Sequence, residues 1–151
     1  MTEGAWLRID ARGVPVQKGT IQTTNKGGAY WREGKALKQW EAAIAAAATE
    51  AMEKNGLTIL DGPIFLCATF WMKRPKARKT EFFHTVRPDL DKLFRAVGDA
   101  LQGIVYEDDK QISQIDSAKV YEGSEALLPL GPLTLEEPGV IIYVAEMPHH
   151  E

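Results

Sequence analysis

Apolar residues along the chain follow three strand-like patterns and a weaker fourth. Residues 5–11 alternate between apolar and polar positions, which is the period of a half-buried strand. Residues 64–72, IFLCATFWM, are apolar on both faces and therefore predict a central strand. Residues 140–147, VIIYVAEM, predict the last strand, and residues 112–122 form the weaker candidate between them.

Two segments have the composition and spacing of helices. Residues 32–56 are rich in alanine and other good helix formers and end at an Asn-Gly pair, which is typical of a helix stop. Residues 89–103 carry apolar side chains at helical spacing and end at a glycine. Residues 12–31, rich in Gly, Thr and Asn, and residues 127–139, rich in Pro and Gly, are expected to be loops.

The order of these elements is strand, helix, strand, helix, strand, strand. It predicts an α+β fold with a small mixed β-sheet of about four strands and two main helices packed on it. A chain of 151 residues is long enough for one domain with a proper core. We expect that domain to span residues 1–147 and residues 148–151 to form a disordered tail.

Amino-acid composition indicates the cellular compartment of the protein but says little about its function. Cys67 is the one cysteine, and it lies in the apolar run of the central strand, so we expect a small core residue in a reducing cytoplasm. No apolar run reaches the roughly 20 residues that span a bilayer, and the first residues lack the pattern of a signal peptide. We therefore expect no membrane partner.

Charge is distributed very unevenly. The net charge of −3 hides a sum of +1 over residues 1–72, +4 over residues 73–106 and −8 over residues 107–151. Such asymmetry is typical of a surface that binds a charged partner.

Residues 73–87, KRPKARKTEFFHTVR, form a basic segment just before the second helix. It contains six basic residues and one acidic residue. A solubilising loop is the ordinary interpretation, but cations beside an acidic centre also suit a phosphodiester polyanion. We expect Phe82 and Phe83 to pack this segment onto the core, although they could also stack on bases. The basic residues are Lys73, Arg74, Lys76, Arg78, Lys79 and Arg87.

Residues 87–111, RPDLDKLFRAVGDALQGIVYEDDKQ, carry six carboxylates. Taken singly they are unremarkable, because aspartates at a helix start cap free N–H groups and an acidic turn is usually solvated. Asp99 and Glu107, like Glu81 upstream, are interpreted as surface charges only.

The two acidic ends of this segment gain interest together. A helix over 90–102 carries the chain about 18 Å away. Residues 104–109, if extended, bring it back by roughly 20 Å, which would place the EDD turn beside Asp89 and Asp91. Carboxylates that crowd together repel each other unless they share a cation, and Mg²⁺ prefers such oxygen ligands.

Arg95 lies four residues after Asp91 and hence on the same helix face. It can position a phosphate and stabilise developing charge, or it can form an ordinary ion pair with Asp91. The spacing favours neither interpretation, and both can hold.

Residues 87–112 resemble the signature of the RusA-type Holliday-junction resolvases. That signature has a DLDN-like start, a helix with a DAL step and a DD-x-Q turn, and the early segment GVPVQKG is also similar to the family. The resemblance implies a small homodimeric endonuclease that uses Mg²⁺, or Mn²⁺ in its place, to cut paired strands of four-way DNA junctions. It further implies a bacterial or phage-encoded cytoplasmic protein of DNA recombination and repair.

The resemblance also implies roles for particular residues. Asp89, Asp91 and Asp109 match the metal-binding, catalytic carboxylates, with Asp108 as a neighbouring candidate. Arg95 stands where the family has a catalytic lysine, and Lys18 matches a basic position of the DNA-binding surface. Lys92 departs from the asparagine that is common after the second aspartate.

Three other hypotheses remain open at this stage. Pro88-Asp89 with Asp108-Asp109-Lys110 also fits the PD-(D/E)xK nuclease pattern, although that pattern normally places its acidic residues on strands. A non-catalytic DNA-binding module would use the carboxylates only for capping and solvation. A glycosyltransferase-type Asp-x-Asp site is the third, but the chain lacks repeated strand–helix alternation.

Overall fold

The computed structural model describes residues 5–19, 21–23, 29–31, 34–77 and 80–148. Four strands form the main sheet in the order β1-β8-β4-β5. Strands β4 and β5 are parallel, and the other neighbouring pairs are antiparallel. The strands are β1 (Leu7–Arg12), β4 (Ile64–Met72), β5 (Ile112–Tyr121) and β8 (Gly139–Glu146).

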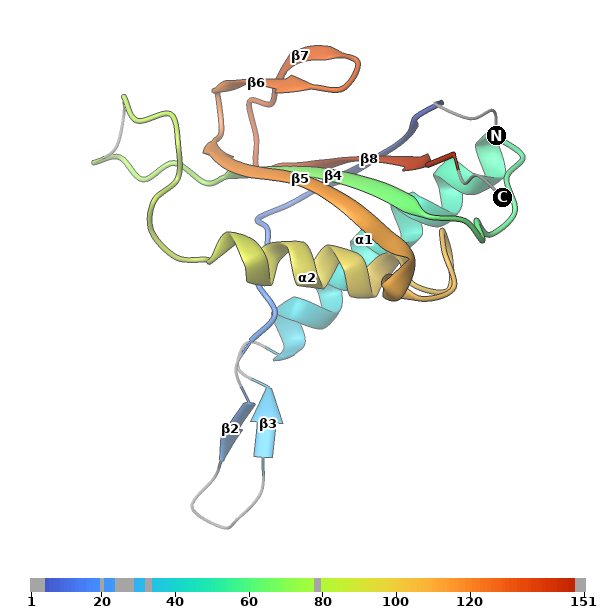
Figure 1. The fold of residues 1–151 in the computed structure, drawn as a ribbon. Coiled ribbons are helices and arrows are strands. Elements are labelled where there is room, and N and C mark those ends of the chain that lie inside the picture. The colour runs from blue at the N-terminus through green and yellow to red at the C-terminus, as the bar shows by residue number, and fades with distance from the viewer. Residues whose placement is uncertain (1–4, 20, 24–28, 32–33, 78–79, 149–151) are drawn as a thin grey trace.

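Two helices, α1 (Gly34–Lys54) and α2 (Leu90–Leu101), cover one face of this sheet (Figure 1). The α+β prediction of a mixed four-stranded sheet with two main helices is therefore confirmed. Each of the four predicted strands and both predicted helices form within a few residues of the expected bounds. For the first helix, residues 32 and 33 lie outside the described part of the chain.

Strand β4 is buried along nearly its whole length because both faces of the sheet are covered there. On the helix side it joins a core that includes Ile44, Leu93 and Tyr106. On the other side Cys67 and Trp71 pack in a second cluster. Cys67 is a buried free thiol, as expected for a core residue. Its burial raises the pKa of the thiol to about 11.

Both segments that were predicted to be loops contain short hairpins instead. Strands β2 (Ile21–Thr23) and β3 (Ala29–Trp31) pair within the Gly/Thr/Asn-rich segment, and in Figure 1 this hairpin projects from the body on the helix side. Strands β6 (Glu125–Leu128) and β7 (Gly131–Thr134) pair over the opposite face. Pro132 is compatible with β7 because a two-stranded ribbon leaves one edge without ladder hydrogen bonds.

The chain turns tightly after α2, contrary to the extended return that the sequence suggested. Gly103, at φ +85°, donates its N–H to the carbonyl of Tyr106 at 2.7 Å. Val105 donates to the carbonyl of Leu101, and the buried Tyr106 hydroxyl donates to the carbonyl of Gly98 at 2.7 Å. Residues 102–106 therefore stay close to the C-terminal end of α2. A short 3-10 helix, η1 (Asp109–Gln111), follows before β5 begins.

Candidate nuclease site along helix α2

Asp89 stands at the start of α2 without capping it. Its backbone is extended, its carbonyl accepts the first helical bond from Leu93, and its carboxylate makes no cap hydrogen bond. The carboxylate is exposed, and it pairs with the ammonium of Lys92 at 3.6 Å, a long and solvated ion pair. The ordinary capping role therefore does not explain this side chain. Asp91, in the first turn, is also exposed.

Two other segments hold the backbone around Asp89. The Asp89 N–H donates to the side-chain oxygen of Gln17 at 2.8 Å, and only 6% of Gln17 is exposed. The Lys18 N–H donates to the carbonyl of Lys92 at 3.1 Å. The N-terminal segment thus docks on the first turn of α2 and fixes where the helix starts.

Lys119 of β5 provides the second support. Its ammonium donates to the carbonyls of Val86 and Pro88, both at 2.7 Å. Burial lowers the pKa of Lys119, and the nearby carboxylate of Asp89 partly opposes that shift. The loop that delivers Asp89 is therefore tied to the edge strand of the main sheet.

We predict that Lys119→Met lowers the free energy of unfolding by about 1–2 kcal/mol, because it keeps the aliphatic stem but leaves two carbonyls without their charged donor. Urea denaturation measures this. Lys38→Met, at an exposed position of α1, is the matched control and should change stability by less than about 0.5 kcal/mol. Equal stability of the two variants would show that the Lys119 bonds do not hold the loop.

Asp108 and Asp109, in the acidic residues 107–109 after α2, have different structural roles. Asp108 caps η1, since its carboxylate accepts from the N–H of Lys110 at 2.9 Å. That hydrogen bond lowers the pKa of Asp108. The side chain of Asp109 is exposed instead, and its N–H donates to the side-chain oxygen of Gln102 at 3.3 Å.

Asp109 faces an open cavity of about 250 Å³ beside the C-terminal half of α2. Arg95 lines the same cavity. Arg95 and the third candidate aspartate, Asp109, thus line one cavity. The remaining lining residues are Phe94, Gly98, Asp99, Ile112 and Ile115.

The two acidic groups do not converge within one chain, and that expectation is wrong. Among the described residues, no group of three or more His, Cys, Asp or Glu side chains could hold a metal ion together. The tight turn at Gly103 is the reason, because it leaves Asp109 near Gln102 rather than at the start of α2. Oxygen donors suit a hard divalent ion chemically, but in this chain Asp89 and Asp91 lie at one end of the helix and Asp109 lies near the other.

Arg95 makes no ion pair with Asp91 in the part of the chain that the structure describes. Its guanidinium is exposed, so the ion-pair interpretation is not realised in this structure. The side chain remains available to a phosphate near Asp109.

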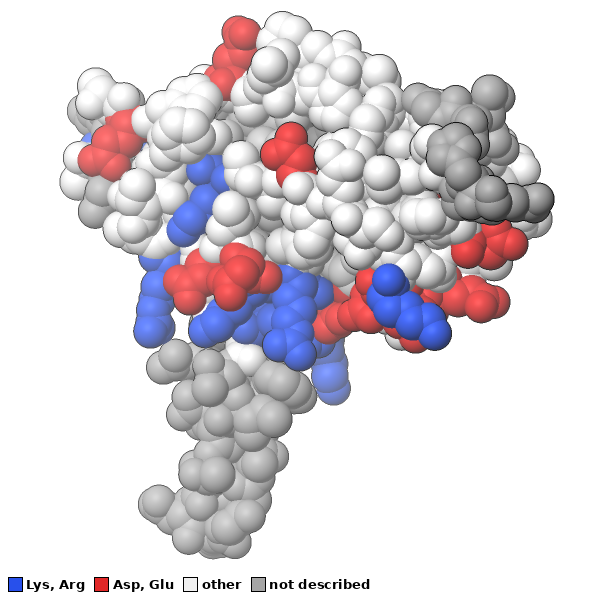
Figure 2. Space-filling model, viewed as in Figure 1, with Lys and Arg blue, Asp and Glu red and all other residues white. Residues whose placement is uncertain are grey.

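Basic and acidic side chains gather along the lower edge of the face in Figure 2, where α2 crosses the body, while the upper part of that face carries few charges. Lys73, Lys76 and Arg87 of the basic segment are exposed. Two of the predicted DNA-binding residues, Arg78 and Lys79, lie outside the described residues.

Arg74 and Lys18 are engaged in contacts within the chain. Arg74 donates to the carbonyl of Glu81 at 2.7 Å, and its guanidinium lies 5.0 Å from the centre of the Tyr121 ring. Lys18 pairs with Asp99 at 2.8 Å and with Glu41 at 3.4 Å. These contacts would compete with DNA.

The Lys18 ion pairs also change the interpretation of Asp99. Burial lowers the pKa of the Lys18 ammonium, but its bonds to Asp99 and Glu41 outweigh burial and raise that pKa. Asp99 is therefore a partner in a link between the N-terminal segment and both helices, not only a surface charge.

The two adjacent phenylalanines were expected to pack on the core, and this is wrong. Phe82 is 41% exposed and Phe83 is 61% exposed. Their rings contact each other edge to face at 4.8 Å between centroids. They present an aromatic pair to solvent, close in sequence to Arg87 and Asp89.

Sequence reasoning missed three residues that support the site, Gln17, Lys119 and Gln111. Their roles are hydrogen bonds between segments far apart in the chain, which leave no local pattern. Gln111 and Gln17 carried a signal, as the last residue of the DD-x-Q turn and as part of the early segment GVPVQKG, but Lys119 carried none.

Comparison with known proteins gives two matches. The family model for endodeoxyribonuclease RusA matches residues 12–127, a range that includes both acidic groups and all of α2. A Bacillus subtilis (strain 168) protein named YqaN, described as uncharacterized, is 24% identical over 153 aligned residues that cover 93% of this chain and 96% of that protein. No helix in the described ranges is long and apolar enough to cross a membrane.

Proposed function

This chain belongs to the RusA family of endodeoxyribonucleases, since the family match covers well over half of its length, and we propose that it resolves four-way DNA junctions with the help of a divalent cation. One observation carries the proposal. The carboxylates of Asp89, Asp91 and Asp109 and the guanidinium of Arg95 are all exposed, at the start of α2, along α2 and at the start of η1.

Asp89, Asp91 and Asp109 would supply the oxygen ligands of Mg²⁺ or Mn²⁺. When bound, such an ion supplies an activated water and neutralises charge on the phosphate. The proposal requires that DNA, the ion or a second copy of the chain draw the two ends of the site together.

Arg95 would hold the scissile phosphate by its guanidinium, because it is exposed and lies beside Asp109. Lys73, Lys76 and Arg87 would contact phosphates further along the DNA. Phe82 and Phe83 would stack on unpaired bases at the branch point, which their exposure permits.

A homodimer would suit a four-way junction, because a two-fold axis places two equivalent sites on opposing strands. We therefore expect paired incisions rather than single nicks.

The experiment that tests this function compares a synthetic four-way junction with a linear duplex of the same sequence. We expect symmetric incisions in the junction with Mg²⁺, none with EDTA and little cutting of the duplex. Equal cutting of both substrates would contradict junction selectivity. Binding without cleavage in any divalent ion would favour the DNA-binding module instead.

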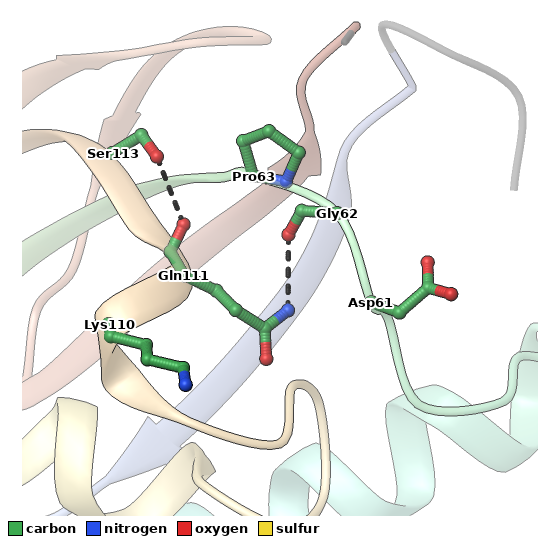
Figure 3. A pocket seen from close by; sticks show the side chains of 6 residues that line it. All are labelled: Asp61, Gly62, Pro63, Lys110, Gln111 and Ser113. Carbon is green, nitrogen blue, oxygen red and sulfur yellow. Dashed lines mark hydrogen bonds between the residues drawn. The ribbon is translucent and has the colours of Figure 1, made fainter.

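Lys110 separates this proposal from the PD-(D/E)xK hypothesis. It lines a cavity of about 550 Å³ with Asp61, Gly62 and Pro63 (Figure 3), not the cavity of Arg95 and Asp109. We predict that Lys110→Ala changes the cleavage rate by no more than about twofold, as for an ordinary surface substitution. Loss of cleavage in a single-turnover assay would support the PD-(D/E)xK reading.

A further inference from the structure

The side-chain amide of Gln111 makes four hydrogen bonds, two in each direction. Its oxygen accepts from the N–H groups of Glu107 at 2.9 Å and Asp108 at 3.1 Å. Its nitrogen donates to the carbonyls of Leu60 at 2.9 Å and Gly62 at 3.1 Å. Figure 3 shows the side chain reaching from η1 to the backbone of Gly62. Every polar valence of the amide is used.

These four bonds join two segments that are far apart in the sequence. Leu60 and Gly62 lie just before β4, the central strand, and Glu107 and Asp108 lie just before η1. A further bond, from the N–H of Leu60 to the carbonyl of Val105 at 2.8 Å, runs between the same segments. Residues 107–109, here called the acidic turn, are thus fixed to the segment that leads into the buried strand β4.

The hydrogen bonds that Gln111 donates are not needed for the turn to form. Asp108 already caps η1 through the N–H of Lys110, and the oxygen of Gln111 completes the capping box. The two donated bonds instead reach the carbonyls of Leu60 and Gly62, in the segment just before β4. Their effect is therefore on where the turn lies relative to the sheet, and not on whether it forms.

We propose that Gln111 is a positioning residue, which holds the acidic turn so that Asp109 faces the cavity of Arg95. This inference rests on the proposed role of Asp109 in cleavage. Only a side-chain amide offers two donors and two acceptors from one group, and glutamine has the length to span both segments. Outer-shell partners of ligating carboxylates typically affect metal affinity or activity by roughly 10- to 100-fold.

The test uses Gln111→Glu, which keeps the two accepted bonds and removes the two donated ones. The matched control is Gln114→Glu, the same change at an exposed position of β5 three residues later. For Gln111→Glu we expect the single-turnover cleavage rate at fixed Mg²⁺ to fall about 10- to 100-fold, with a higher Mg²⁺ concentration for half-maximal rate. Junction binding in EDTA should stay within about threefold of the control, whose charge change is the same.

A second readout does not depend on cleavage. Amide hydrogen exchange at Glu107 and Asp108 should be faster in Gln111→Glu than in wild type or in Gln114→Glu, by about tenfold or more, because the anchored turn opens locally. If Gln111→Glu does not fold, Gln111→Asn, which keeps the chemistry but not the length, is compared in the same assays.

The outcomes are distinct. Faster exchange with unchanged cleavage would overturn the positioning role. Unchanged exchange would overturn the anchor itself. Equal losses of cleavage and of junction binding would also overturn the positioning role, because they indicate a general structural defect. If wild type itself cuts no junction, the proposed function fails, whereas the exchange experiment still decides whether Gln111 anchors the turn.

Discussion

Asp91→Asn is expected to lower the rate of junction cleavage on the order of 10³-fold, since the loss of a charged oxygen ligand removes several kcal/mol of stabilisation from the reacting centre. The exchange of oxygen for an amide nitrogen changes little in size. Asp91 is exposed in the first turn of α2, so the cost in stability should be no more than about 1 kcal/mol from the lost interaction with the helix dipole.

DNA binding should separate from cleavage in this variant. Removing a negative charge from a surface that meets phosphates leaves binding unchanged or makes it tighter, and this is measured with a labelled junction in EDTA. Asp61→Asn, an exposed aspartate in the loop before β4, is the matched control and should cut like wild type. If Asp91→Asn cuts as fast as Asp61→Asn, Asp91 has no part in the reaction.

Arg95→Ala is the second large effect that we predict. Because its guanidinium is exposed and shares a cavity with Asp109, its loss should lower single-turnover cleavage roughly 100- to 1000-fold, as for other preorganised donors to a developing charge. The free energy of unfolding should change by no more than about 0.5 kcal/mol, since Arg95 makes no ion pair among the described residues.

Arg95→Lys gives the sharper comparison, because lysine is the side chain that the family resemblance led us to expect at this position. The charge is kept, but the two-pronged hydrogen bonding of arginine is lost. We expect activity within about tenfold of wild type, which corresponds to one net hydrogen bond. Lys38→Ala, an exposed lysine of α1, is the control for a lost positive charge. Equal activity of Arg95→Ala and Arg95→Lys would show that the charge at this position does not matter.

The main elements of the fold were predictable from local pattern. The run IFLCATFWM is apolar on both faces because β4 is covered on both faces, and its length matches the observed strand. Helix α2 was visible in the spacing of Leu93, Val97 and Leu101, all of which are buried. Apolar periodicity marks the positions that become buried, and the main strands and helices are the elements that bury one or both faces.

The hairpins and the turn after α2 were not predictable by the same means. Strands of three or four residues contain too few positions for a period to be recognised. Pro129 and Pro132 suggested a loop, although Pro129 lies between the paired strands β6 and β7 and Pro132 lies within β7. The turn at Gly103 depends on the buried hydroxyl of Tyr106 and its bond to Gly98, a contact that follows from packing rather than from sequence spacing.

The sequence named candidate residues for the site but did not predict how the chain arranges them. Asp89, Asp91, Arg95 and Asp109 were singled out by the family resemblance, and their part in catalysis stays a prediction. The extended return that would close the site within one chain was wrong, because the chain instead turns at Gly103. Each of the two ends of the site is held by its own hydrogen bonds, from Gln17 and Lys119 at one end and from Gln111 at the other.

The most direct test of the central claim is a crystal structure of the protein bound to a four-way junction in Mn²⁺, with the ion located by its anomalous scattering. We predict an ion that contacts carboxylate oxygens of Asp89, Asp91 and Asp109 and lies beside a DNA phosphate. An ion bound elsewhere, or a complex in which Asp109 stays apart from Asp89 and Asp91 around every bound ion, would contradict the account.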